Sequence, residues 1–289
     1  MVNHRIKDVP QHCADLATFL SRGWLCPSIY FCEWLQIAAG IVAIDFSYGR
    51  LNQELPFDER PIQEEDAKSA TLGPFIRELA RFNFIWGALE GLIDILFLPR
   101  APRRERSDID AACFFIKSHF RPVPVPFPNT YFDLLSELRD SLLDHSHYES
   151  LTSQFTLCCH INAFSMGLHV VRKIRNQFAH GVNTFPTPPM YQWTQTADHR
   201  IITLSSSLLL LSAEMLIAAQ ATAAREGYDF ASGFYTKEEL DIELRRLMTI
   251  HLLSPEPFRD QLVLDFGEME ETEVEETESD ETELDDTDP

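Results

Sequence analysis

Residues 161–181, INAFSMGLHVVRKIRNQFAHG, form the stretch from which the fold of this chain can best be read. Its apolar side chains recur every three or four positions, which is the spacing of one face of an α-helix: Ile161, Phe164, Leu168, Val171, Ile174 and Phe178. Gly181 follows His180 and favours a left-handed stop at the helix end. The spacing therefore predicts a long helix that buries one face.

Arg175 interrupts the apolar arc of this predicted helix, because its direction falls between those of Leu168 and Ile161. An arginine is almost never fully buried without a partner. Either a carboxylate from another helix meets Arg175, or the face is a cleft in which an anion binds. Other polar residues form one stripe beside the apolar arc at spacings of three and four: His169, Arg172, Asn176 and His180.

The same helical spacing recurs along most of the chain. It predicts further helices at 13–22, 28–46, 71–98, around 111–120, and at 130–145, 201–226 and 236–252. Only the stretch YQWTQTADHRIITL, residues 191–204, suggests two short strands. We therefore expect an all-α protein built as a bundle of long antiparallel helices around one core.

Polar and proline-containing stretches indicate how the chain is divided. Residues 47–70 are turn-rich and predict a linker or surface loop. Residues 267–289 hold thirteen acidic residues and no basic one, which predicts a disordered tail and leaves the rest of the chain with a formal charge of −8. The expected regions are an N-terminal helical extension at 1–60, a helical core at 71–226 with an Arg- and Pro-rich insertion at 99–130, a C-terminal helical region at 227–266, and the tail.

Composition narrows the class of protein. Six cysteines without paired spacing favour reduced thiols, and we expect a cytoplasmic protein. The apolar run 204–224 includes Glu214, and it predicts a buried helix rather than a membrane span. Neither the histidines near Asp144 nor the run 158–160 has the spacing of a zinc site, so we expect no metal and no cofactor.

The string Arg175-Asn176-Gln177-Phe178-Ala179-His180 resembles the motif of the HEPN superfamily. That motif is an arginine, usually followed by Asn or another polar residue, and a histidine about five positions on. The resemblance covers roughly residues 70 to 226. It implies a helical homodimer that brings two motifs together, and metal-independent RNA cleavage in which the ribose 2′-hydroxyl attacks the adjacent phosphate. Val182 stands where some HEPN toxins have a tyrosine that is nucleotidylated, so that route of silencing is not supported.

The resemblance assigns catalytic roles within the motif. His180 would move protons, since histidine has a reference pKa of about 6.5. Arg175 would hold the phosphate, and Asn176 would orient the helix end. On a straight helix Arg175 and His180 point roughly 140° apart. They can therefore act on one atom only if the helix ends or kinks before His180, or if two copies face each other.

Further site residues are expected beside the motif. Along one flank of the predicted helix 71–98, Glu90 is the first choice and Asn83 the second for a residue that positions Arg175 or the substrate. Arg172 and His169, from the polar stripe, would contact the substrate. The other interpretation of the flank is a solvated helix surface with incidental charges.

Two functions remain open at this point. The first is an endoribonuclease, acting on RNA in stress or phage defence and controlled by a protein inhibitor or activator. The second is a non-catalytic helical binding or regulatory module in which Arg175 and His180 are structural, since many HEPN domains have no nuclease role. A weaker idea is that the acidic tail mimics nucleic acid, and a solubilising tail is the interpretation that we prefer.

Overall fold

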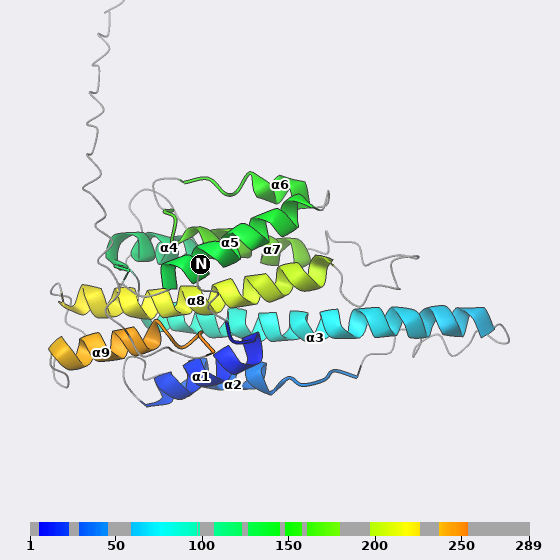
Figure 1. Ribbon diagram of the computed structural model, residues 1–289, viewed down its shortest axis with the longest axis horizontal. Helices are drawn as coiled ribbons and strands as arrows, with labels where there is room; N and C mark the ends of the chain where they lie inside the picture. The colour runs from blue at the N-terminus through cyan, green and yellow to red at the C-terminus, as the bar shows by residue number, and fades with distance from the viewer. Residues whose placement is uncertain are drawn as a thin grey trace, which may run out of the picture. The chain divides into compact units, whose positions relative to one another are not determined.

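The computed structural model describes residues 6–22, 29–45, 59–96, 98, 107–122, 127–144, 148–157, 161–179, 197–225 and 237–253. Within these ranges the protein is all-helical, which confirms the predicted class. Its helices are α1 (Val9–Ser21), α2 (Ile29–Gly40), α3 (Glu59–Leu96), α4 (Asp108–His119), α5 (Phe127–Leu143), α6 (Glu149–Thr152), α7 (Met166–Ala179), α8 (Ala197–Arg225) and α9 (Lys237–Leu247) (Figure 1). Residues 1–255 form one compact unit, and the acidic tail lies outside the described residues.

Helix α3 begins earlier than the sequence suggested. It starts at Glu59, so residues 59–70, which were expected to be part of a linker, are helical. Pro74, which falls in the first turn of the predicted helix 71–98, lies inside the observed helix. A proline there removes one backbone hydrogen bond without ending the helix, because the residues on both sides keep their own bonds.

Helix α7 begins later than the sequence suggested. Residues 161–165 form a turn, in which the Asn162 side chain accepts a bond from the Ser165 amide at 3.0 Å. The Ser165 hydroxyl accepts one from the Asn162 amide at 2.9 Å. Such reciprocal bonds supply partners for backbone groups that have none at a helix start, so the regular helix begins at Met166.

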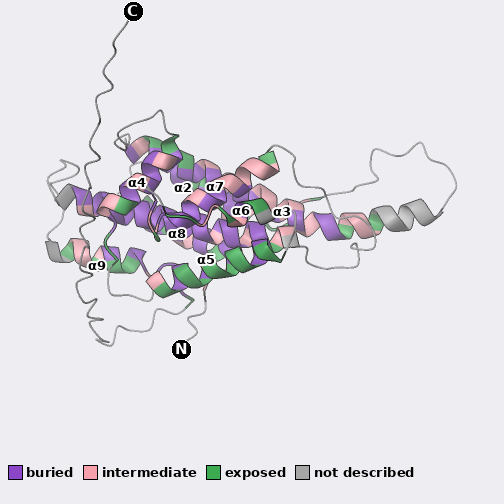
Figure 2. Ribbon diagram, turned by 90° about the horizontal axis from the view of Figure 1, so that it is seen from above, coloured by how far each residue is buried: buried purple, intermediate pink, exposed green. Residues whose placement is uncertain are grey.

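Helix α8 forms the centre of the bundle. It starts at Ala197, so the strands expected within 191–204 are absent from its described part, residues 197–204. Its window 198–223 is long and apolar enough to cross a membrane, but 89% of that window is buried inside the protein. Figure 2 shows this burial along α8, while α5 has a largely exposed side. The prediction of a buried helix is therefore confirmed.

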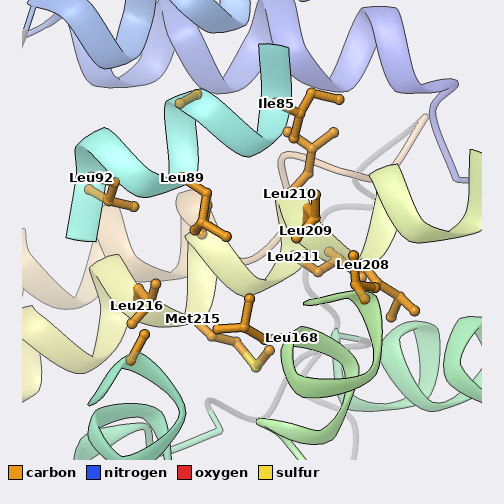
Figure 3. Packing of buried hydrophobic residues seen from close by; sticks show 14 of the residues in the cluster. Ile85, Leu89, Leu92, Leu168, Leu208, Leu209, Leu210, Leu211, Met215 and Leu216 are labelled. Carbon is orange, nitrogen blue, oxygen red and sulfur yellow. The ribbon is translucent and has the colours of Figure 1, made fainter. Parts of the chain in front are cut away.

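The two longest helices, α3 and α8, run side by side in the same direction (Figure 1). Figure 3 shows Ile85 of α3 beside Leu210 of α8, and Leu92 beside Leu216 farther along both helices. The expected antiparallel order is therefore wrong for this pair. Short loops make neighbouring helices antiparallel, whereas α4 to α7 lie between α3 and α8 in the chain and allow a parallel pair.

The N-terminal helices pack onto α3. Arg81 of α3 is buried and donates hydrogen bonds to the carbonyls of Ala38, at 3.1 Å, and Ile41, at 2.5 Å. These carbonyls lie at the C-terminal end of α2, where backbone acceptors lack partners within the helix. The buried arginine therefore fixes the end of α2 against α3, and Glu78 balances its charge.

Candidate functional site around Arg175

Helix α7 carries the HEPN-like motif and is held in place by its apolar face. Leu168, Val171 and Ile174 are fully buried in the core shared with α8. Near the end of α7, the Phe178 ring lies 6.0 Å from the Phe75 ring of α3 and 6.5 Å from the Tyr148 ring. Phe178, within the motif, therefore lies at a junction between α3, α6 and α7.

Arg175 lies over the ring of Trp86 in α3, with its guanidinium carbon 5.6 Å from the ring centre. Trp86 is buried, and its indole N–H donates to Glu90 Oε1 at 2.6 Å. A cation over an indole face is attracted to the negative potential of the ring. Among the described residues, the partner of Arg175 is thus an aromatic face and not a carboxylate, which was one of the two arrangements expected from the sequence. Glu90 reaches Arg175 only through Trp86.

The flank of α3 beside Trp86 is open to solvent. At about 100° per residue, Glu90 and Asn83 lie next to Trp86 around the helix, and Gly87 follows them. Glu90 and Asn83 are both exposed. A methyl group on Gly87 would lie 2.6 Å from Cζ3 of Trp34, so the α2 tryptophan ring occupies the space that this glycine leaves.

Arg172 faces a different helix from Arg175. It donates to Asp110 Oδ1 at 2.8 Å and to Ser107 Oγ at 2.5 Å. Ser107 is the N-cap residue of α4, and its side chain accepts from the Asp110 amide. Arg172 therefore locks the start of α4 onto α7, and a substrate would compete with that ion pair for its guanidinium group.

The structure brings together some of the predicted site residues and separates others. Arg175 and Glu90 converge on one tryptophan, whereas Arg172 is engaged with α4. His169 and Asn176 are half-buried on α7. Helix α7 ends at Ala179, and His180 lies outside the described residues.

A depression in the surface lies away from this cluster, at the end of α2. It is lined in part by Ala43, Asp45, Gly73 and Arg77, and none of the predicted site residues lines it. The chemistry available around Arg175 itself is a partly exposed cation over the face of one indole ring and a carboxylate bound to the N–H of the same ring.

A second cluster of ionisable groups was missed at the sequence level. Glu214 of α8 is fully buried, and His12 Nε2 of α1 lies 2.5 Å from its Oε1. His251 Nδ1, after α9, lies 3.3 Å from its Oε2. The only signal in the sequence was an acidic residue inside the apolar run 204–224. Nothing in the pattern connects that residue to two histidines near opposite ends of the described chain.

The electrostatics of this second cluster favour an ionised Glu214. Burial alone would raise the pKa of its carboxyl group, but His251 and His12 outweigh burial and lower that pKa. Burial raises the pKa of the thiol of Cys13, the next residue after His12, to about 12, because burial outweighs the opposite effect of the Arg81 charge. The backbone amide of Lys7 donates to the carbonyl of His251 at 2.9 Å. The cluster thus ties α1, α8 and the segment after α9 to one another.

No cluster of three or more ligating side chains suited to a metal ion occurs in the described ranges. Comparison of the chain with protein-family models, curated proteins and solved structures finds no match. The resemblance to the HEPN motif therefore depends on residues 175–180 and on the helices around them.

Proposed function

We propose that this protein is a HEPN-like, metal-independent endoribonuclease that works as a homodimer. The observation that supports this best is the partly exposed Arg175, held over Trp86 by a contact that leaves its charge uncancelled by a carboxylate among the described residues. A guanidinium group in that state can bind a phosphate, because arginine presents several hydrogen-bond donors in a planar fork. The motif histidine, His180, follows five residues after Arg175 in the sequence.

The proposed reaction is an internal transfer. The ribose 2′-oxygen attacks the adjacent phosphorus and loses its proton to a base, and the bond from phosphorus to the 5′-oxygen breaks as that oxygen gains a proton. The products are a 2′,3′-cyclic phosphate and a 5′-hydroxyl end. Arg175 stabilises the charge on the phosphorane, and His180 carries a proton. Glu90 keeps Trp86, and with it Arg175, in place.

The test is incubation of the full-length protein with mixed cellular RNA in the presence of EDTA. The wild type and four variants are compared: His180→Ala, Arg175→Ala, Arg172→Ala and Arg139→Ala. Arg139 is an exposed arginine on α5 and serves as the matched control. We expect cleavage with cyclic phosphate ends from the wild type and Arg139→Ala, and none from the first two variants. Retained cleavage in either of those two would refute the proposal.

The Arg172→Ala variant tests the assignment of Arg172 as a substrate contact. Because Arg172 already binds Asp110 and Ser107, its loss should weaken folding as well as any RNA contact. An RNA contact predicts a raised KM with an unchanged kcat at a temperature where the variant is folded. A wild-type KM would indicate that Arg172 contacts α4 and does not contact the RNA.

A second candidate is a non-catalytic helical module, favoured by one observation. The contact of Arg175 with the buried Trp86 ring joins α7 to α3 and needs no ligand. In that case Arg175→Lys keeps the cation over the ring, and the variant should behave as the wild type does. In the nuclease it loses the bidentate grip on phosphate, and cleavage should fall. A wild type that is folded but does not cleave RNA, together with an Arg175→Lys variant that is as stable as the wild type, would favour the non-catalytic module.

A further inference from the structure

Helix α2 has an exposed apolar stripe. Tyr30, Trp34 and Ile37 lie at successive spacings of four and three, and they are 75%, 41% and 47% exposed. Val42, just after the helix, is also exposed. These four residues are called the α2 stripe below. The other exposed large apolar residues among the described positions are spread over α5, α9 and two loops. In the α2 stripe, by contrast, Tyr30, Trp34 and Ile37 follow one face of the helix, and Val42 comes just after its end.

Side-chain packing and hydrogen bonds to α3 hold α2, and with it the α2 stripe, in place. The Trp34 ring packs at 5.4 Å from the Phe84 ring and fits over Gly87. Arg81 holds the C-terminal end of the helix. A continuous exposed apolar patch on a rigid element marks an interaction site more often than scattered apolar residues do.

The charge of α2 excludes two kinds of occupant. Its sequence IYFCEWLQIAAG contains one acidic residue, Glu33, and no lysine or arginine. Nucleic acid needs basic side chains that meet phosphates, and helices that lie on membranes carry lysine and arginine on their polar face. The occupant must therefore be an apolar protein surface.

We propose that the occupant of the α2 stripe is the α2 stripe of a second copy of this chain. Residues spaced by four and three form a stripe along one helix face, and the ridges of such a face pack into the grooves of its own copy across a two-fold axis. A fully exposed tyrosine or tryptophan side chain can bury about 150–250 Å². Tyr30 and Trp34 are 75% and 41% exposed, so each can bury only that fraction of its area in an interface. With Ile37 and Val42, they supply about half of the roughly 800 Å² per partner of a standard interface.

The α2 stripe lies close to Trp86 and Arg175 on α3 and α7. Trp34 touches Gly87, and the open flank of α3 from Gly87 to Glu90 separates the stripe from Trp86 and Arg175. Gly91, on the same side, has open space where a side chain would be, so another backbone can approach there. A second copy on the stripe therefore borders the site. The inference deepens the homodimer of the proposed function by naming its interface.

The experiment is sedimentation velocity on the full-length protein. We expect the wild type to sediment as a dimer of the 33.2 kDa chain and Ile37→Lys as a monomer. The matched control is Ile242→Lys on α9, where the isoleucine is 57% exposed, and it should remain dimeric. Tyr30→Lys serves as a second variant, and the circular dichroism of each variant shows that it is folded.

A monomeric wild type would overturn the inference, as would dimers of both folded stripe variants or equal dissociation of the Ile242→Lys control. A wild type that is monomeric alone but binds another apolar protein would assign the stripe to a different partner. The readout is independent of cleavage. A dimer without nuclease activity removes the proposed function and keeps this interface, whereas an active nuclease whose two folded stripe variants stay dimeric keeps the proposed function and removes this interface.

Discussion

Replacing one of the two histidines that contact Glu214 should lower the free energy of unfolding by much more than the loss of a single side chain suggests. Glu214 is fully buried, and His12 at 2.5 Å and His251 at 3.3 Å are its hydrogen-bonding partners. Replacing His12 by leucine leaves a buried carboxylate with only the more distant histidine. Breaking a buried charge pair by removing one partner costs about 3–5 kcal/mol. At about 2–4 °C per kcal/mol, Tm should fall by roughly 10 °C.

A double-mutant cycle measured by urea unfolding tests this reasoning. Glu214→Met replaces the carboxylate by an apolar side chain of similar shape, so a buried charge is no longer left behind when His12 is also replaced. We expect the double variant to be more stable than the sum of the single losses predicts, by about 1–3 kcal/mol. Thr18→Ala, an exposed position on α1, is the control. Additive losses, or a loss below about 1 kcal/mol for His12→Leu, would refute the reasoning.

Three more predictions concern single sites. Arg175→Ala should lower the free energy of unfolding, measured in urea, by about 1 kcal/mol, because the cation lies over its tryptophan at a partly exposed position. A loss of several kcal/mol would instead indicate a buried ion pair. Gly87→Ala should destabilise by about 1–3 kcal/mol because the new methyl group meets Trp34, whereas Gly91→Ala has open space and should gain up to about 1 kcal/mol. Burial lowers the pKa of His199, so the free energy of unfolding should fall as pH drops below the reference value of 6.5, and His199→Asn should reduce that fall.

The sequence predicted the helices best where apolar periodicity was strong and uninterrupted. The buried run of α8 and the amphipathic face of α5 were expected close to where they are found. The errors lie at helix starts. Residues 59–70 are polar and contain proline, so they suggested a loop, and the start of α7 depends on side-chain bonds between Asn162 and Ser165 that periodicity does not register.

Tertiary relations were harder to predict for a physical reason. The parallel order of α3 and α8 depends on how the intervening helices pack, and no local pattern encodes it. The sequence did indicate that Arg175 needs a partner and that helix 71–98 would supply it. The partner is Trp86, a buried residue of that helix. A contact between a cation and an indole ring cannot be recognised from pairs of opposite charges in the sequence. The prediction of a carboxylate partner therefore selected Glu90, which contacts Trp86.

Two charged residues on apolar helix faces, Glu214 and Arg175, look alike in sequence but differ in what surrounds them. Glu214 is fully enclosed, and two histidines hold its charge, so it can bind nothing further. Arg175 is partly exposed, and an aromatic ring attracts its charge without neutralising it. A buried, compensated charge contributes to the specificity or stability of a fold, whereas a charge kept accessible on a rigid base remains available for a ligand. We therefore assign the proposed chemistry to Arg175 and expect Glu214 to contribute to stability.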